Sequence, residues 1–230
     1  MWMHRYRRGH NTPTQQKIKK YDMIRNVLFD LGGVIMDIDR NRCVEAFKAL
    51  GFADVEEFLG DYAQKGSFAD LESGRIDAAE FRRRIRPCLP EGTGDRAIDR
   101  AFCEFLIGIP LRRLVALREL RRLGLGVYML SNTNPIMWNS KIAEEFGQEG
   151  LRREDYFDGI VTSFEARVMK PAPEIFAYAA ERLGIEPSET ILLDDGEANV
   201  RAAEAAGWHA ALVPPGVEFD ALLRQSGIIK

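Results

Sequence analysis

The chain has 230 residues, 46% of them hydrophobic and 29% charged, with a formal net charge of −3. This composition excludes a disordered or collagen-like chain and fits one globular core, with or without an insert. No run of about 18 apolar residues predicts a transmembrane helix, and no apolar run near the N-terminus predicts a secretory signal. The three cysteines are few and widely spaced, which favours reduced thiols. We therefore expect a cytoplasmic protein without a membrane partner.

The basic residues are concentrated at the N-terminus. Residues 1–25 carry seven Lys and Arg side chains against one acidic residue, Asp22. Such an arm can contact nucleic acid or an anionic membrane, or it can be a solvated extension. The remainder of the chain is acidic and offers no second basic patch to support nucleic-acid binding. We therefore predict that residues 1–24 are a basic extension and that nucleic acid is not a partner.

Short apolar runs that favour β-structure recur along the chain. They lie at 26–29, 125–130, 159–163, 190–193 and 209–213. Each run ends in polar or turn-forming residues, as buried parallel strands do. Helical periodicity fills the gaps at 111–123, 173–183 and 197–206. Strands that alternate with helices predict an α/β fold with a parallel sheet and right-handed crossovers.

One long stretch breaks this alternation. Residues 41–108 contain no clear strand and show helical patterns at 44–50, 55–62, 78–85 and 96–106. We predict an all-helical cap over 41–108, inserted into a core made of 25–40 and 109–230. Four phenylalanines are expected mostly in the interior of the cap: Phe47, Phe58, Phe68 and Phe81. Inserts of this kind often act as lids over a site.

Polar side chains follow three of the predicted strands, at the edge where parallel sheets bind ligands. One further residue, Lys170, lies in the loop after the third strand. The complete set is Asp30, Ser131, Asn132, Lys170, Asp194 and Asp195. A single aspartate after a strand is usually a cap or turn residue. Together, however, these residues have the composition that phosphate chemistry needs.

Carboxylates in this set can both bind a metal and react. Mg²⁺ prefers carboxylate and carbonyl oxygens. Asp30 and Asp195 can supply such ligands, with the Gly32 carbonyl as a third candidate and Asp194 as a possible helper. An aspartate can also attack phosphorus and form an aspartyl phosphate. The sequence therefore predicts Mg²⁺ as cofactor and Asp30 as a candidate nucleophile.

A negative nucleophile that attacks a phosphate requires positive charge and hydrogen-bond donors. Lys170 can neutralise the aspartate and a phosphate oxygen. The Ser131 hydroxyl and the backbone amides that follow it, beginning with Asn132, can bind the remaining oxygens. We expect the partner to be a small phosphorylated metabolite.

Four motifs in register resemble those of the haloacid dehalogenase-like hydrolases. The first is Val-Leu-Phe-Asp-Leu-Gly-Gly-Val at 27–34, and the second is Leu-Ser-Asn at 130–132. The third is Lys-Pro at 170–171, and the fourth is Leu-Leu-Asp-Asp-Gly at 192–196 with Asn199. The resemblance covers about residues 26–215, and the predicted insert lies where a helical cap of this family belongs.

The resemblance implies a Rossmann-like core with a helical cap. It also implies that Asp30 is the nucleophile, that Ser131 and Lys170 bind phosphate, and that Asp195 holds magnesium. The Asp-Leu-Gly first motif and the Ser-Asn-Thr-Asn second motif look most like the α-D-glucose-1-phosphate phosphatase branch.

Gly32 departs from the family pattern, in which most phosphatases carry an aspartate two residues after the nucleophile. That carboxyl protonates the leaving oxygen and activates water, and general acid–base help is worth about 10²–10⁴-fold. An anomeric hydroxyl or acyl group leaves more easily and needs less help. Asp37 and Asp39 could supply the acid from a hairpin, but we favour a role as polar residues of the hairpin or hinge.

Two classes of function follow from these observations. The first is a magnesium-dependent phosphatase acting on a small metabolite, with a sugar phosphate as the expected substrate. The second is a weakly active or non-catalytic scaffold that binds phosphate or a protein partner, because Gly32 replaces the acid. The charges retained at Asp30, Lys170 and Asp195 favour the enzyme. The sequence leaves open whether the protein is a monomer or a homodimer.

Some features allow two interpretations. Met137 and Trp138 either line the substrate pocket or pack the helix that follows the second motif. Four arginines, Arg82, Arg83, Arg84 and Arg86, either form a solvated helix face or draw anionic substrates toward the cap. We favour the solvated face.

Overall fold

Five parallel strands lie at the centre of the fold in the order β5-β4-β1-β6-β7. They are β1 Asn26–Phe29, β4 Gly126–Ser131, β5 Gly159–Thr162, β6 Thr190–Asp194 and β7 His209–Leu212. The computed structural model describes residues 23–60 and 63–230, so most of the predicted basic extension lies outside the described residues. All five predicted strands are confirmed, each to within one residue at either end. Within the described ranges no helix is long and apolar enough to cross a bilayer.

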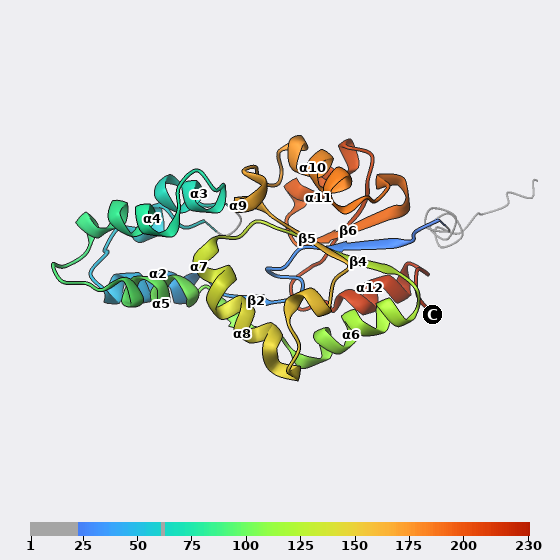
Figure 1. The fold of residues 1–230 in the computed structure, drawn as a ribbon, viewed down its shortest axis with the longest axis horizontal. Helices are drawn as coiled ribbons and strands as arrows, with labels where there is room; N and C mark the ends of the chain where they lie inside the picture. The colour runs from blue at the N-terminus through green and yellow to red at the C-terminus, as the bar shows by residue number, and fades with distance from the viewer. Residues whose placement is uncertain (1–22, 61–62) are drawn as a thin grey trace, which may run out of the picture.

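Helices cover both faces of this sheet because its strands are apolar on both sides. In β1, Val27 and Phe29 face one core while Leu28 faces the other. The helices are α6 Leu111–Arg122, α10 Pro173–Leu183, α11 Glu197–Ala205 and α12 Phe219–Gln225. Figure 1 shows α10 and α11 above the sheet and α6 and α12 below it. The predicted α/β fold is confirmed, although α12 was not predicted.

Short elements complete the core after β4 and β5. They are α7 Pro135–Met137, a π-helical turn at Trp138–Ile142, α8 Ala143–Phe146 and α9 Ser163–Ala166. Asn134 begins the first of them, because its side-chain oxygen accepts hydrogen bonds from the backbone N–H groups of Ile136 and Met137, both at 3.1 Å.

Four helices form a separate layer beside one end of the sheet, which we call the cap (Figure 1). They are α2 Arg40–Ala49, α3 Gly66–Glu72, α4 Ala78–Ile85 and α5 Asp95–Cys103. Aromatic rings fill the interior between them: Phe68 lies 5.0 Å from Phe81 and 5.1 Å from Phe102, in edge-to-face geometry. Phe47 packs on the same group. The predicted helical cap and its phenylalanine core are present.

Two details of the cap prediction were wrong. The helix expected at 96–106 ends at Cys103, and Leu106–Gly108 forms strand β3, which pairs antiparallel with β2 Asp37–Ile38. The apolar residues after Cys103 continue a helical period, but pairing with β2 draws the chain out of the helix. The helix expected at 55–62 is, within the described residues, only a 3₁₀ turn at Val55–Glu57.

The cap contacts the core at a second place besides the β2–β3 pair. The Ser163 hydroxyl donates a hydrogen bond to the backbone carbonyl of Glu72 at 2.6 Å and accepts one from the Thr133 N–H at 3.0 Å. Two residues later, Gly74 has φ +64° and packs directly against the Phe164 carbonyl. The end of α3 is therefore fixed to the start of α9.

Gly74→Ala tests this contact, with Gly92→Ala as a matched control. Both glycines have positive φ, but a Cβ at Gly74 would lie 2.0 Å from the Phe164 oxygen, whereas nothing lies within 4 Å of one at Gly92. We expect Gly92→Ala to cost about 1 kcal/mol of unfolding free energy and Gly74→Ala about 3 kcal/mol or more. Urea unfolding measures both, and equal losses would contradict the close contact.

Candidate active site

The strand order brings the predicted site residues together. Because β4, β1 and β6 are neighbours and run parallel, their carboxyl ends lie side by side. Ser131 ends β4, Asp30 follows β1 and Asp194 ends β6. All three side chains are buried, and Asp194 is completely so.

Lys170 lies in the middle of this group with almost no exposed surface. Its Nζ is 2.9 Å from Asp30 Oδ1, 2.6 Å from Asp194 Oδ2 and 2.9 Å from the Leu130 carbonyl oxygen. These contacts use all three donors of the ammonium group. The lysine therefore connects the ends of three neighbouring strands.

Asn132 fixes the backbone of Lys170. The Asn132 amide nitrogen donates to the Lys170 carbonyl, and the Lys170 N–H donates to the Asn132 side-chain oxygen, both at 2.9 Å. This reciprocal pair holds the loop after β5 against the end of β4. The side chain of Asn132 thus positions the lysine in this structure.

Asp30, Asp194 and Asp195 form an acidic cluster around the ammonium group. One carboxylate oxygen from each lies within 4.8 Å of the others. Asp194 is held most firmly, because its Oδ1 accepts from the Gly196 N–H at 2.9 Å and from the Asn199 amide at 2.8 Å, while its Oδ2 faces Lys170. Asp195 makes no such set of contacts and lines the cavity.

The electrostatics of the cluster show an excess of negative charge. Burial, and to a smaller extent Asp194 and Asp195, raise the pKa of Asp30 while Lys170 lowers it, and the net result is a pKa of about 7. Burial and the neighbouring Asp194 raise the pKa of Asp195 to about 6. Burial lowers the pKa of Lys170, but Asp194 and Asp30 outweigh that effect, so its pKa is raised overall. One ammonium group does not balance three carboxylates.

The residues present fit a magnesium ion. Carboxylate oxygens are the ligands Mg²⁺ prefers, and a divalent cation would offset the unbalanced charge. The backbone at Gly33 also approaches Asp195 closely. Gly33 has φ +72°, and a Cβ there would come within 2.2 Å of Asp195 Oδ2. Only glycine allows the backbone of the first motif to approach this carboxylate so closely.

Among the cavities that open beside the cluster, two share Lys170 and Asp195. The inner cavity has a volume of about 100 Å³ and is lined by Asp30, Ser131 and Lys170. The outer cavity, of about 610 Å³, shares Lys170 with it. Two cap residues, Gln64 and Glu72, line both cavities. They were missed because no sequence pattern shows which cap residues face the core.

Comparison with known proteins decides the family. Residues 24–207 match the family model for haloacid dehalogenase-like hydrolases. The chain is 38% identical over 197 residues to the D-ribitol-5-phosphate phosphatase of Bacteroides thetaiotaomicron, covering 86% of this chain and 95% of that protein. The chain belongs to the haloacid dehalogenase-like hydrolases.

Solved structures agree with this assignment. A family enzyme from Bacteroides thetaiotaomicron, in complex with magnesium and inorganic phosphate, is 40% identical with a TM-score of 0.81, covering 87% of this chain and all of that one. A predicted member from Porphyromonas gingivalis is 34% identical, also with a TM-score of 0.81, covering 88% and 97%. The predicted family and its Rossmann-like core are confirmed.

Asp37 and Asp39, the two candidates for the missing acid of this hydrolase, do not line the inner cavity. Asp37 accepts from Arg113 Nη1 at 2.7 Å, and the same buried guanidinium donates to Glu218 at 2.9 Å. Asp39 caps α2 by accepting from the Asn41 N–H at 2.9 Å. The favoured interpretation of both as polar hinge residues agrees with the structure.

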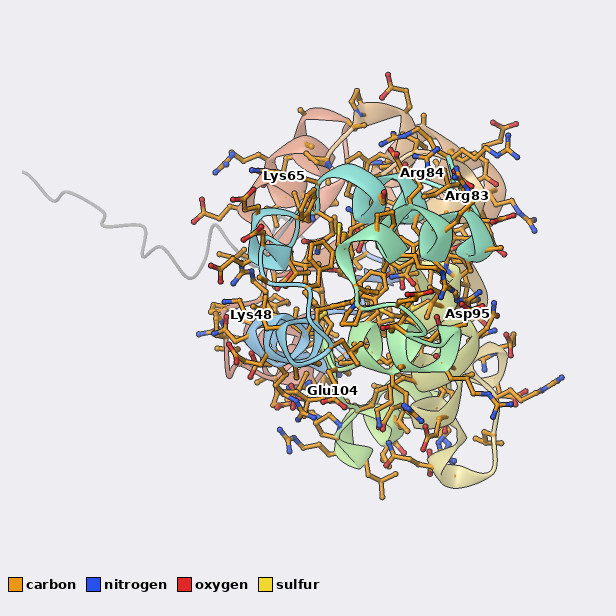
Figure 2. The ribbon with its side chains drawn as sticks, turned by 90° about the vertical axis from the view of Figure 1, so that its left-hand side faces the viewer. Lys48, Lys65, Arg83, Arg84, Asp95 and Glu104 are labelled. Carbon is orange, nitrogen blue, oxygen red and sulfur yellow. The ribbon has the colours of Figure 1, made fainter. Side chains whose placement is uncertain are left out.

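The positions of Met137, Trp138 and the cap arginines decide between the two interpretations that the sequence allowed for each. Met137 lines the inner cavity, whereas the Trp138 ring lies under the Arg153 guanidinium, 3.9 Å from its centre. The cap arginines are paired with cap carboxylates: Arg82 with Asp99, Arg83 with Glu80, Arg84 with Glu80 and Asp70, and Arg86 with Asp95. Figure 2 shows Arg83 and Arg84 on the outer side of the cap, so they form a solvated and neutralised face.

Lys170→Met tests the central position of the lysine. It leaves Asp30 and Asp194 buried without a cation, and losing one partner of a buried pair costs about 3–5 kcal/mol of unfolding free energy. The loss should be larger at pH 8 than at pH 5.5, because the carboxylates regain neutrality by taking up protons at the lower pH. Denaturant unfolding at both pH values measures this.

Lys141→Met is the matched control for that change. Lys141 pairs with Glu145 at 2.6 Å on a partly exposed helix face, where such pairs are worth less than about 1 kcal/mol. If both variants lost the same stability, with the same pH dependence, Lys170 would not be the counter-charge of the cluster.

Proposed function

We propose that this chain is a magnesium-dependent phosphatase that hydrolyses a sugar or sugar-alcohol phosphate through an aspartyl-phosphate intermediate. The observation that carries the proposal is the arrangement of Lys170 between Asp30 and Asp194, beside a cavity that Asp195 also lines. The similarity to a D-ribitol-5-phosphate phosphatase, and to an enzyme structure with magnesium and phosphate, supports it.

Asp30, Asp195 and the carbonyl of Gly32 are the proposed magnesium ligands. Both oxygens of Asp194 are already hydrogen-bonded and fully buried, so we assign that residue to positioning Lys170 rather than to the metal. When bound, the ion neutralises the charge of the phosphoryl group and orients it.

Asp30 acts as the nucleophile in the proposed reaction. Its free carboxylate oxygen attacks phosphorus, the bond from phosphorus to the ester oxygen breaks, and the released oxygen takes up a proton. The Leu31 N–H and Lys170 both contact Asp30 Oδ1, at 2.7 and 2.9 Å, which fixes the carboxylate and leaves Oδ2 for attack. Water then hydrolyses the aspartyl phosphate and restores Asp30.

Lys170 and Ser131 are the proposed phosphate-binding groups. Both line the inner cavity beside Asp30, and within the described part of the chain the Ser131 hydroxyl makes only one hydrogen bond, a long one of 3.4 Å to the Asn132 carbonyl. A positioned cation and a hydroxyl donor stabilise negative oxygens most effectively where water is excluded.

The leaving group decides how much the absence of an acid at Gly32 matters. D-ribitol 5-phosphate, on which the Bacteroides relative acts by its name, releases an ordinary primary alcohol. We therefore extend the proposed substrate class from anomeric sugar phosphates to sugar-alcohol phosphates. The α-D-glucose-1-phosphate phosphatase branch stays a prediction.

Phosphate release from a substrate panel tests the activity. With Mg²⁺ present, D-ribitol 5-phosphate, glucose 1-phosphate and acetyl phosphate should yield phosphate, and chelation of the metal should stop the reaction. Asp30→Asn should lower turnover by at least about 10³-fold, because it removes the nucleophile. Release by that variant at the wild-type rate would exclude the covalent mechanism. A wild-type protein that releases phosphate from no member of the panel would support the scaffold alternative.

Gly32→Asp tests whether the missing acid limits the rate. A Cβ at Gly32 would meet only Ile38, at 3.5 and 3.6 Å, which is ordinary contact. We expect turnover of an alkyl phosphate to rise about tenfold or more, and that of acetyl phosphate to rise less, since an acyl group leaves without protonation. Gly32→Ala is the control for added volume. Equal gains on both substrates would show that the carboxyl does not act as the acid.

A further inference from the structure

Glu72, the last residue of α3, projects from the cap into the site. Its backbone is fixed, because the Ser163 hydroxyl donates to its carbonyl at 2.6 Å and Gly74 packs against Phe164 two residues later. Its side chain lines the inner cavity together with Asp30 and Lys170. A carboxyl group is therefore held at a defined place opposite the acidic cluster.

The Glu72 carboxyl has no hydrogen bond or ion pair to any residue in the described part of the chain. Burial alone raises its pKa to about 8, with no contribution from a neighbouring charge. A buried carboxyl group without a partner is available to bind a polar group of a ligand.

The two cavities indicate which part of a substrate would lie beside Glu72. The inner cavity, about 100 Å³, holds only a few water molecules and suits a phosphoryl group. The outer cavity, about 610 Å³, has the size of a small-molecule pocket. Glu72 and Gln64 line both, so they lie where the inner cavity meets the outer one. A substrate with its phosphate at Asp30 would pass its organic part by these two cap residues.

The charges of the lining select among organic groups. Lys170 is the only Lys or Arg among the described residues that line these two cavities, and we have assigned it to the phosphate. A substrate carboxylate beside Glu72 would be buried without a cation, which is strongly unfavourable. A hydroxyl group can instead accept from or donate to the Glu72 carboxyl.

From these contacts we propose that Glu72 selects substrates whose organic part is uncharged and carries hydroxyl groups, and that it disfavours substrates with a carboxylate in that position. This inference rests on the proposed phosphatase function and deepens it. Glu72 is assigned to recognition of the organic part, because it lines the outer cavity as well as the inner one.

Matched substrate pairs test the selection directly. The pairs are 2-hydroxyethyl phosphate with phosphoglycolate, and glycerol 3-phosphate with 3-phosphoglycerate; each pair differs by a hydroxymethyl group against a carboxylate. We expect the wild-type protein to prefer the alcohol of each pair by at least about tenfold in kcat/KM. Glu72→Lys should reduce this preference at least about tenfold, mainly through a lower KM for the carboxylate. Glu72→Gln, which keeps the hydrogen bonds, should retain the preference.

Glu91→Lys is the control, because it makes the same substitution at an exposed position of the cap outside both cavities and should retain wild-type selectivity. Equal turnover of alcohol and carboxylate by the wild-type protein would overturn the inference, even if no Glu72 variant folds. A Glu72→Lys protein with wild-type selectivity would also overturn it. Acetyl phosphate separates the two proposals: its turnover shows that the phosphatase function holds when selectivity fails, whereas inactivity on every substrate removes both.

Discussion

The ion pairs of Lys170 are the contacts on which the rest of the site depends. A buried ammonium group is stable only if its charge and donors are matched, and here Asp30, Asp194 and the Leu130 carbonyl match them. These partners come from the ends of three adjacent parallel strands, so the lysine also fixes the sheet edge. Asn132 in turn holds the lysine backbone. The same contacts that stabilise the fold thus leave Asp30 and Asp195 with unbalanced negative charge, which suits a metal.

The cap contributes the residues that are placed to meet the organic part of a substrate. The core supplies the proposed groups for a phosphoryl group, most of them at the carboxyl ends of strands, whereas the residues placed to meet the organic part come from α3 and the segment before it. Their position depends on two contacts far apart in the chain, the β2–β3 pair and the Ser163–Glu72 hydrogen bond. In the proposed function, chemistry and specificity therefore reside in separate layers of the molecule.

Much of the core could be predicted from sequence, because buried parallel strands give continuous apolar runs and the polar residues after them meet at one edge. Asp30, Ser131 and Asp194 follow from that rule, whereas Lys170, in the loop after β5, was added from the needs of phosphate chemistry and from the Lys-Pro motif. The β2–β3 pair was missed, since β2 has only two residues and shows no periodicity. Glu72 was missed for another reason: α3 is short, and which of its residues faces inward depends on how the cap docks on α9, which one sequence does not show.

The buried guanidinium of Arg113 links distant parts of the chain. It contacts the Ile35 carbonyl, Asp37 of β2 and Glu218 at the start of α12, and these contacts hold the pKa of Glu218 at about 2. The last helix of the protein is thereby fastened to the strand that leads into the cap. A change at the C-terminal end can therefore reach the strand that leads into the cap through Arg113, and it can reach β1 through Phe219, whose ring lies 4.9 Å from that of Phe29.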